Sequence, residues 1–233
     1  NSTTSKVIMG NPSRWEFTTG PDTVPLRNPE GAECRIINDT LGIGDLKVDT
    51  QAFLTCDQYD NIFNKMPIGG ILGLDTYDQT IASRSYFGNL WENKKLDSPV
   101  FTFYLPSGSL LNGQLTLGGV DTTKYTGEIR TVRLHVDTNG LTWGRAWMVG
   151  MSGLYANSKL LANSTDGKTP MSLSYAVFDT GTAFIQTPDV HTATALYAQI
   201  SPKFEMIDPA GAWGVPCETM ATLAPTLTFT FGE

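Results

Sequence analysis

Three things that many functional classes depend on are scarce in this sequence: histidine, positive charge and long apolar runs. Only two histidines, His135 and His191, occur in 233 residues. This argues against a histidine-rich metal site and leaves few candidate bases for a Ser-His-Asp triad. Acidic residues outnumber basic ones by 23 to 16, and the net charge of -7 would repel a polyanion such as DNA. No apolar run reaches the about 18 residues that a membrane-spanning helix needs. We therefore expect no metal, no nucleic-acid partner and no membrane span.

Charged residues are also few, at 17% against about 25% in an average soluble domain, whereas hydrophobic residues reach 40%. This balance is too apolar for a disordered chain. A chain of 233 residues can form one large β domain or two modest lobes, and it can bury a core without metals or cross-links. The acidic surface is compatible with solubility at neutral pH, and also with work at low pH, where its carboxylates would be largely neutral.

The chain has three cysteines, an odd number that leaves one without a partner in any disulfide scheme. Cys34 and Cys56 flank a strand-like segment and could close a short loop. Cys217 is then left over. It is either a buried free thiol or a cysteine whose partner lies outside these residues.

Three Asn-x-Ser/Thr sequons, which begin at Asn1, Asn38 and Asn163, accompany abundant Ser and Thr and few Lys. Such sequons are acceptors of N-linked glycans in secreted proteins. We therefore predict glycosylation at these three asparagines and a secreted, extracellular or vacuolar location.

The hydrophobic pattern predicts an all-β fold. Short apolar runs separated by Gly, Pro, Asn and Asp recur about every ten residues, and helical periodicity is scarce. The last predicted strand alternates Leu227, Phe229 and Phe231 with threonines, as a half-buried strand should. The predicted strands cover residues 41–48, 100–105, 114–117, 129–136, 176–178 and 226–231.

Two short helices are predicted as well. One covers residues 85–94. The other begins with Thr187 as N-cap, Pro188 at the first helical position and Asp189 in the first turn. Its apolar stripe consists of Val190, Ala193, Tyr197 and Ile200.

One motif carries chemistry. Residues 176–182 (AVFDTGT) place Asp179 directly after a fully apolar strand, followed by a glycine and flanked by two hydroxyls. A carboxylate at the end of a buried strand is costly unless it is hydrogen-bonded or has a function. Gly181 permits a tight turn that brings backbone N–H groups to the carboxylate, and the hydroxyls of Thr180 and Thr182 can lock that turn. The tripeptide alone is equally compatible with an ordinary Asx turn.

The surroundings of this motif resemble the pepsin-like aspartic proteases, and the secreted fungal branch most closely. The resemblance runs nearly from end to end and in the family's order. The matching segments are 67–74 (PIGGILGL), 89–91 (NLW), 98–105 (SPVFTFYL), 113–121 (GQLTLGGVD), 124–127 (KYTG), 179–182 (DTGT), 215–217 (VPC) and 225–231 (PTLTFTF). The first of these resembles the segment that supports the first catalytic loop, and Asp179 falls where the catalytic loop of the second lobe belongs.

The resemblance implies a bilobal aspartic endopeptidase that needs no metal or organic cofactor. Residues 1–130 would be the remainder of the N-terminal lobe, and residues 131–233 a partial C-terminal lobe. Two aspartates, one from each lobe, would share a proton: one activates a water and the other donates to the scissile carbonyl. Because two close carboxylates cannot both ionise easily, such a pair works in acid. The substrate would be a peptide or protein that binds in an extended conformation.

The sequence departs from the family pattern in three places. No Asp-Thr-Gly precedes residues 1–5, so the chain is expected to begin just after the first catalytic loop. The flap segment resembles residues 15–20 (WEFTTG), with Thr19 in place of the family's tyrosine before Gly20. The chain also stops at residues 232–233, before the family's last strands, where the partner of Cys217 is expected. Four Asp-Thr pairs within the first 76 residues lack the glycine and are interpreted as turns or caps: Asp22-Thr23, Asp39-Thr40, Asp49-Thr50 and Asp75-Thr76.

Three interpretations fit these departures. The first is part of a two-aspartate protease whose other aspartate lies in a missing segment or on a second chain. The second is a catalytically inactive pepsin-fold protein that serves as a binding module or inhibitor. The third, a homodimer with one Asp-Thr-Gly per chain, is disfavoured because Asp179 lies far from the N-terminus, after most of another lobe.

Overall fold

The computed structural model describes residues 2–8, 12–17, 30–60, 68–76, 85–108, 111–135, 146–161, 175–182, 185–208 and 212–231. These residues form mostly strands with short helices between them, so the all-β prediction is confirmed. None of the helices in the described ranges is long and apolar enough to cross a membrane. The chain divides into two compact units. Unit 1 comprises residues 1–15 and 31–131, and unit 2 comprises residues 16–30 and 132–233.

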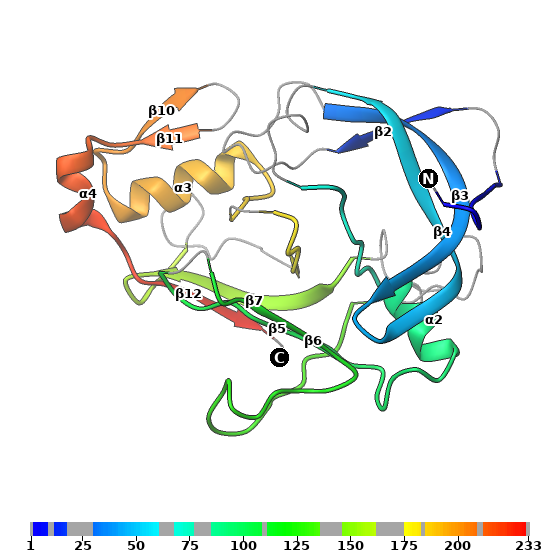
Figure 1. The fold of residues 1–233 in the computed structure, drawn as a ribbon. Coiled ribbons are helices and arrows are strands. Elements are labelled where there is room, and N and C mark those ends of the chain that lie inside the picture. The colour runs from blue at the N-terminus through cyan, green and yellow to red at the C-terminus, as the bar shows by residue number, and fades with distance from the viewer. Residues whose placement is uncertain are drawn as a thin grey trace. The chain divides into compact units, whose positions relative to one another are not determined.

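A long antiparallel hairpin dominates unit 1. It consists of β3 (Glu30–Ile43) and β4 (Leu46–Tyr59), which run side by side in Figure 1. The short strands β1 (Lys6–Val7) and β2 (Ser13–Phe17) also pair with β3. Gly44, at the tip, has a φ of 56°, a left-handed conformation that glycine adopts without strain. The predicted strand over residues 41–48 is therefore wrong, because it spans the end of β3, the turn and the start of β4.

The open end of this hairpin is held by a disulfide and a carboxylate. Cys34 and Cys56 lie directly opposite each other in the ladder and are joined by a disulfide, so the predicted bridge is confirmed. One residue beyond β4, Asp60 accepts hydrogen bonds from the Gly31 backbone N–H (2.7 Å) and from Arg14 Nη2 (2.6 Å). These contacts fix the ends of β2, β3 and β4 to one another.

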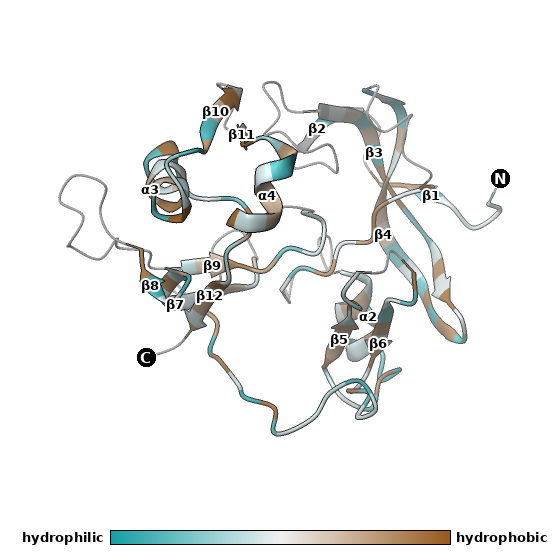
Figure 2. Ribbon diagram, turned by 90° about the vertical axis from the view of Figure 1, so that its left-hand side faces the viewer, coloured by the Kyte–Doolittle hydropathy of each residue, from teal (hydrophilic) through white to brown (hydrophobic). Residues whose placement is uncertain are grey.

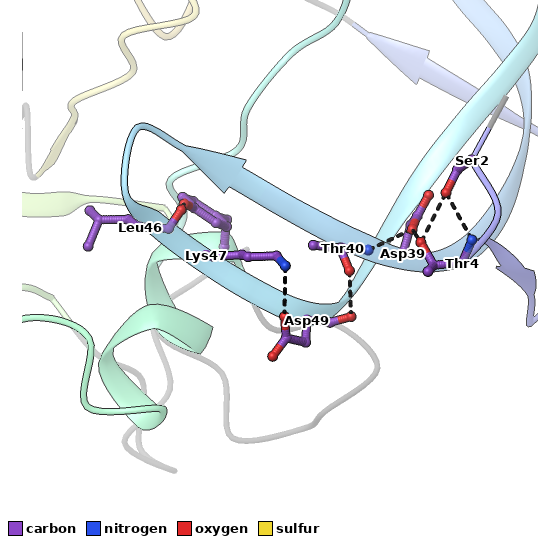
Figure 3. Close-up of polar contacts among 8 residues, drawn as sticks. Ser2, Thr4, Asp39, Thr40, Leu46, Lys47 and Asp49 are labelled. Carbon is purple, nitrogen blue, oxygen red and sulfur yellow. Dashed lines mark hydrogen bonds and ion pairs between the residues drawn. The ribbon is translucent and has the colours of Figure 1, made fainter.

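The N-terminal segment is attached to β3 through Asp39 (Figure 3). The Thr4 hydroxyl donates to Asp39 Oδ1, and the Thr40 backbone N–H donates to the same oxygen at 2.7 Å. The Ser2 and Thr4 hydroxyls lie 3.0 Å apart. The Thr40 hydroxyl donates to the backbone carbonyl of Asp49 on β4 at 3.2 Å. Side chains therefore reinforce the two-residue pairing of β1 with β3.

Helix α2 (Tyr86–Glu92) packs against the hairpin and forms the core of unit 1. The Ser85 hydroxyl caps the helix by accepting from the Gly88 backbone N–H at 3.2 Å. The helix lies within the predicted range of residues 85–94. The Tyr86 hydroxyl donates to the Leu46 carbonyl (2.8 Å) and accepts from the Ile43 N–H (3.2 Å), so it bridges both strands at the hairpin tip. The buried apolar side chains of this core are Val48, Tyr86, Leu90 and Leu96.

The rest of unit 1 includes the two-stranded sheet of β5 (Phe101–Tyr104) and β6 (Gln114–Leu117), both at predicted positions. The turn after β6 is organised by Asp121, whose carboxylate accepts from the Thr123 N–H (3.0 Å), the Thr123 hydroxyl (2.7 Å) and Gln114 Nε2 (2.9 Å). The described part of the segment 67–74 is irregular and exposes Ile68, Ile71 and Leu72.

Unit 2 is built on β7 (Met148–Ala156), which pairs with β8 (Lys159–Leu160), β9 (Tyr175–Val177) and β12 (Leu227–Phe231). Both β9 and β12 are close to their predicted positions. Helix α3 (Val190–Ile200) covers this sheet, as Figure 1 shows. Together the helix and the sheet bury Leu154, Ala156, Leu161, Ala195 and Leu196.

The start of α3 differs from the prediction by two residues. Asp189, not Thr187, is the N-cap: its Oδ1 accepts from the Thr192 backbone N–H at 2.7 Å. Pro188 therefore precedes the helix. The buried face is also rotated, because Thr192 and Ala193 are buried whereas Val190 is half exposed. Figure 2 shows apolar and polar residues on opposite sides of this helix.

The remaining elements of unit 2 are β10 (Glu205–Asp208), β11 (Ala212–Gly214) and α4 (Cys217–Leu223). Cys217 is an exposed free thiol, so a buried thiol is excluded.

The predicted strand over 129–136 is wrong for its described residues, which form one isolated bridge, Leu134 with Val149. Hydropathy alternates over residues 132–136, but Ile129 and Val132 are exposed.

Candidate active site

Asp179 lies at the point where β9 leaves the sheet of unit 2. Val177 pairs with Met148 on β7, and the Phe178 N–H donates to the Trp147 carbonyl at 2.9 Å, one residue further along. The ladder stops there. Asp179 therefore directly follows β9 and Phe178, the residue that extends the backbone pairing of β9 by one hydrogen bond.

The carboxylate of Asp179 is held by its own loop. Its Oδ1 accepts from the Gly181 backbone N–H at 2.8 Å, and its Oδ2 accepts from the Thr182 hydroxyl at 2.6 Å. The backbone carbonyl of Asp179 accepts from the Thr182 N–H at 3.2 Å and closes the turn. Each oxygen makes one of these bonds and keeps further acceptor capacity, since an ionised carboxylate can accept about four. The side chain is exposed and yet oriented.

Gly181 is needed for this close approach. A Cβ at this position would lie 3.1 Å from Asp179 Oδ1, which is tighter than ordinary van der Waals contact. Any side chain here would push the carboxylate or the turn away. The Thr180 side chain is exposed, and Thr182, which supplies the second hydrogen bond, is half-buried.

An oriented, solvent-accessible carboxylate can take a proton from a water or donate one to an oxygen. Water-activated peptide hydrolysis by carboxylates requires two of them, one ionised and one protonated. Asp179 supplies one, and both of its side-chain hydrogen bonds come from residues 181 and 182. Among the described residues, no group of three or more His, Cys, Asp or Glu side chains is arranged to hold a metal ion.

Apolar and aromatic residues precede and follow the loop in the sequence. Phe178 and Phe231 lie against each other with ring centroids 5.3 Å apart, and Tyr175 contacts His135 at 4.1 Å between centroids. Phe178 nevertheless exposes 55% of its surface. Val177 and Ile185 are also largely exposed, at 52% and 70%. Exposed apolar side chains therefore precede and follow the candidate carboxylate along the described part of the chain.

The predicted flap and glycosylation residues can be located only in part. The flap residues Thr19 and Gly20 and the sequon residues Asn1 and Asn163 lie outside the described residues. Asn38 is described and lies within β3, paired with Lys6 and Ala52.

Two of the Asp-Thr pairs interpreted as turns or caps lie inside strands, so that interpretation was wrong for them. Asp39 is in β3 and Asp49 in β4. Asp39 has a lowered pKa because the hydroxyls of Ser2 and Thr4 and the Thr40 N–H hydrogen-bond its charged form. The sequence does not reveal this cluster, because the two segments that form it are 35 residues apart.

Comparison with known families confirms the resemblance. The profile of the family described as "Eukaryotic aspartyl protease" matches residues 30–233. The chain therefore belongs to this family of pepsin-like proteins, and its all-β architecture agrees with that membership.

Several curated proteins are similar along most of the chain. Endothiapepsin of Cryphonectria parasitica is 28% identical, over 100% of this chain and 49% of the relative. An aspartic protease of Phaffia rhodozyma is 27% identical, over 92% of this chain and 49% of its own length. Pregnancy-associated glycoprotein 6 of Ovis aries is 31% identical, over 83% of this chain and 46% of its own. The chain thus spans about half the length of the curated relatives it matches.

Proposed function

We propose that this chain contributes Asp179, the aspartate of the second lobe, to the active site of an aspartic endopeptidase. The observation that carries this proposal is the Asp179 loop itself. An exposed carboxylate follows a short apolar strand and is oriented by the Gly181 N–H and the Thr182 hydroxyl. It does so in a chain that belongs to the aspartyl protease family.

The proposed reaction is hydrolysis of a peptide bond by a water held between two aspartates. One carboxylate removes a proton from the water, and its protonated partner donates to the carbonyl oxygen. The substrate is a peptide or protein in an extended conformation, and the reaction proceeds in acid because the two carboxylates share a proton. It needs no organic cofactor.

The second aspartate comes from another segment or another chain, which packs around Asp179. The exposed apolar side chains of Val177, Phe178 and Ile185 support this part of the proposal. Exposed apolar side chains on both sides of a functional group favour an interaction site. Covering it would exclude water from the carboxylates and strengthen their coupling.

The remaining assignments follow the same family pattern. Residues 1–130 form the remainder of the N-terminal lobe and residues 131–233 part of the C-terminal lobe, which the two compact units support. Thr19 and Gly20 lie in the flap, and Asn1, Asn38 and Asn163 carry glycans. The protein is secreted or vacuolar, where the disulfide Cys34–Cys56 persists in an oxidising environment.

The test is cleavage of an unfolded protein substrate at acid pH by the wild-type protein and by Asp179→Asn. The amide keeps the shape of the side chain but cannot exchange the proton, so we expect the rate to fall by at least about 10³-fold. Asp121→Asn is the matched control, because it changes a carboxylate bound by a similar loop to the same amide. Equal rates for Asp179→Asn and the wild type would refute the assignment.

The alternative is a catalytically inactive pepsin-fold protein that binds or inhibits another protein. Thr19, in place of the flap tyrosine, favours it, and one of the similar proteins is named a glycoprotein without mention of peptidase activity. The same assay separates the two: the alternative predicts tight binding of an intact protein with no hydrolysis at any pH, unchanged by Asp179→Asn.

A further inference from the structure

The two cysteines of the disulfide in unit 1 differ in their exposure to solvent. Cys34, on β3, exposes 1% of its surface, whereas Cys56, on β4, is exposed. The bridge therefore has one protected end and one end at the surface.

The strands around the bridge are paired independently of it. Ala32 pairs with Tyr59 on one side of the disulfide, and Arg35 pairs with Thr55 on the other. Beyond β4, Asp60 accepts from the Gly31 N–H at 2.7 Å. If the S–S bond opened, the hairpin would stay closed on both sides and would keep the two sulfurs opposite each other.

Thiol–disulfide exchange requires a thiolate to reach one sulfur and to expel the other. The sulfur of Cys34 is enclosed, so an incoming thiolate can reach only that of Cys56. We propose that Cys56 is a thiol-exchange site for small-molecule thiols in the folded protein.

The exchange conserves atoms and electrons. The thiolate of the small thiol forms a bond to Cys56 Sγ, and the bond from Cys56 Sγ to Cys34 Sγ breaks. Cys34 leaves as a thiolate and takes a proton from solvent. Because the ladder holds Cys34 opposite Cys56, Cys34 Sγ can lose this proton again and attack Cys56 Sγ of the mixed disulfide as a thiolate. The bond from Cys56 Sγ to the small molecule then breaks, the small thiol leaves as a thiolate that takes up a proton, and the bridge is restored.

Local charge selects among thiols. Arg35 and Asp57, which follow Cys34 and Cys56 in the sequence, form an ion pair and compensate each other, while Glu33 before Cys34 is exposed and the chain carries a net charge of -7. A neutral or cationic thiol therefore exchanges faster than an anionic one at low salt, and the difference shrinks as salt screens the charges.

The test uses the folded chain with Cys217→Ser, which removes the exposed free thiol. The protein is incubated with 2-mercaptoethanol, quenched with acid, and then unfolded and alkylated for peptide mass measurement. We expect the mercaptoethanol adduct on Cys56 and the alkyl group on Cys34. Adducts in equal amounts on both cysteines would overturn the proposal. So would an adduct that forms only at denaturant concentrations that unfold the chain.

A pair of single substitutions tests the same asymmetry without relying on exchange. In Cys34→Ser the remaining Cys56 thiol should react with iodoacetamide at least about tenfold faster than the Cys34 thiol does in Cys56→Ser, because burial protects Cys34. Circular dichroism verifies that both variants are folded. Equal alkylation rates in two folded variants would contradict the proposal, whatever the peptidase assay shows.

Discussion

At the scale of single residues, several carboxylates in this chain are bound by hydroxyls and backbone N–H groups. Asp39, Asp121 and Asp189 all have pKa values below the ordinary one, and hydrogen bonds are the main cause in each case. For Asp121 the Thr123 hydroxyl and Gln114 lower the pKa from 3.8 to about 2. Hydrogen bonds of this kind keep such carboxylates ionised in acid, where an ordinary aspartate is protonated.

The pH dependence of stability follows from this shift. Because the pKa of Asp121 is lower in the folded state, its contribution is fully present above about pH 4 and is lost as the pH falls through about 2. Asp121→Asn should therefore destabilise the protein at pH 5, and its difference from the wild type should shrink by pH 2. Urea denaturation at both pH values measures it. Asp97→Asn, at an exposed aspartate, is the control, and an effect of Asp121→Asn that is equal at both pH values would contradict the account.

The sequence predicted Asp179 and its loop because the motif is local: strand, carboxylate, glycine and hydroxyl lie within seven residues. Of the three predicted contacts, those from the Gly181 N–H and the Thr182 hydroxyl are present, whereas the predicted contact of the Thr180 hydroxyl stays a prediction. The Asp39 cluster could not be predicted in the same way. It depends on a strand pairing between Lys6 and Asn38, which no local pattern encodes.

At the scale of elements, local signals also decided which predictions succeeded. The alternation of β12 and the residues of α2 are local signals, and both elements lie within one or two residues of their predicted positions. The hairpin of β3 and β4 was not predicted, because residues 41–48 were interpreted as one strand. In the structure Gly44 and Asp45 form a two-residue turn in the middle of this segment. For α3, two polar residues compete as caps, and the Asp189 carboxylate bonds the Thr192 N–H, whereas the Thr187 hydroxyl bonds a carbonyl.

The contact between α2 and the hairpin tip can be tested through Tyr86. Its hydroxyl bonds both strands, and the side chain exposes 2% of its surface, so Tyr86→Phe removes the hydroxyl from two partly buried hydrogen bonds, to the Leu46 carbonyl and from the Ile43 N–H. We expect a loss of about 1–3 kcal/mol in the free energy of unfolding, measured by chemical denaturation. Tyr125→Phe, at a tyrosine that is 39% exposed, should change it by less than about 0.5 kcal/mol. Equal effects of the two substitutions would show that the bridge contributes nothing.

At the scale of the whole molecule, the chain combines membership of a protease family with a match to only part of its relatives. The chain belongs to the eukaryotic aspartyl protease family but spans about half the length of its relatives, and its one Asp-Thr-Gly lies in unit 2. The exposed apolar side chains next to Asp179 are the observation on which the proposed contact with another segment or chain rests. The sequence revealed the family through the order of its segments. It could not show the exposure of this surface, which depends on how the strands of unit 2 pack.

The most direct test of the central claim is the dependence of the peptidase rate on pH. A pair of aspartates that shares a proton titrates with two macroscopic pKa values. The account therefore predicts a bell-shaped profile with its maximum in acid, which is retained in Asp121→Asn and absent in Asp179→Asn. A bell-shaped acid profile that survives in Asp179→Asn would contradict the account, because catalysis would then belong to other carboxylates.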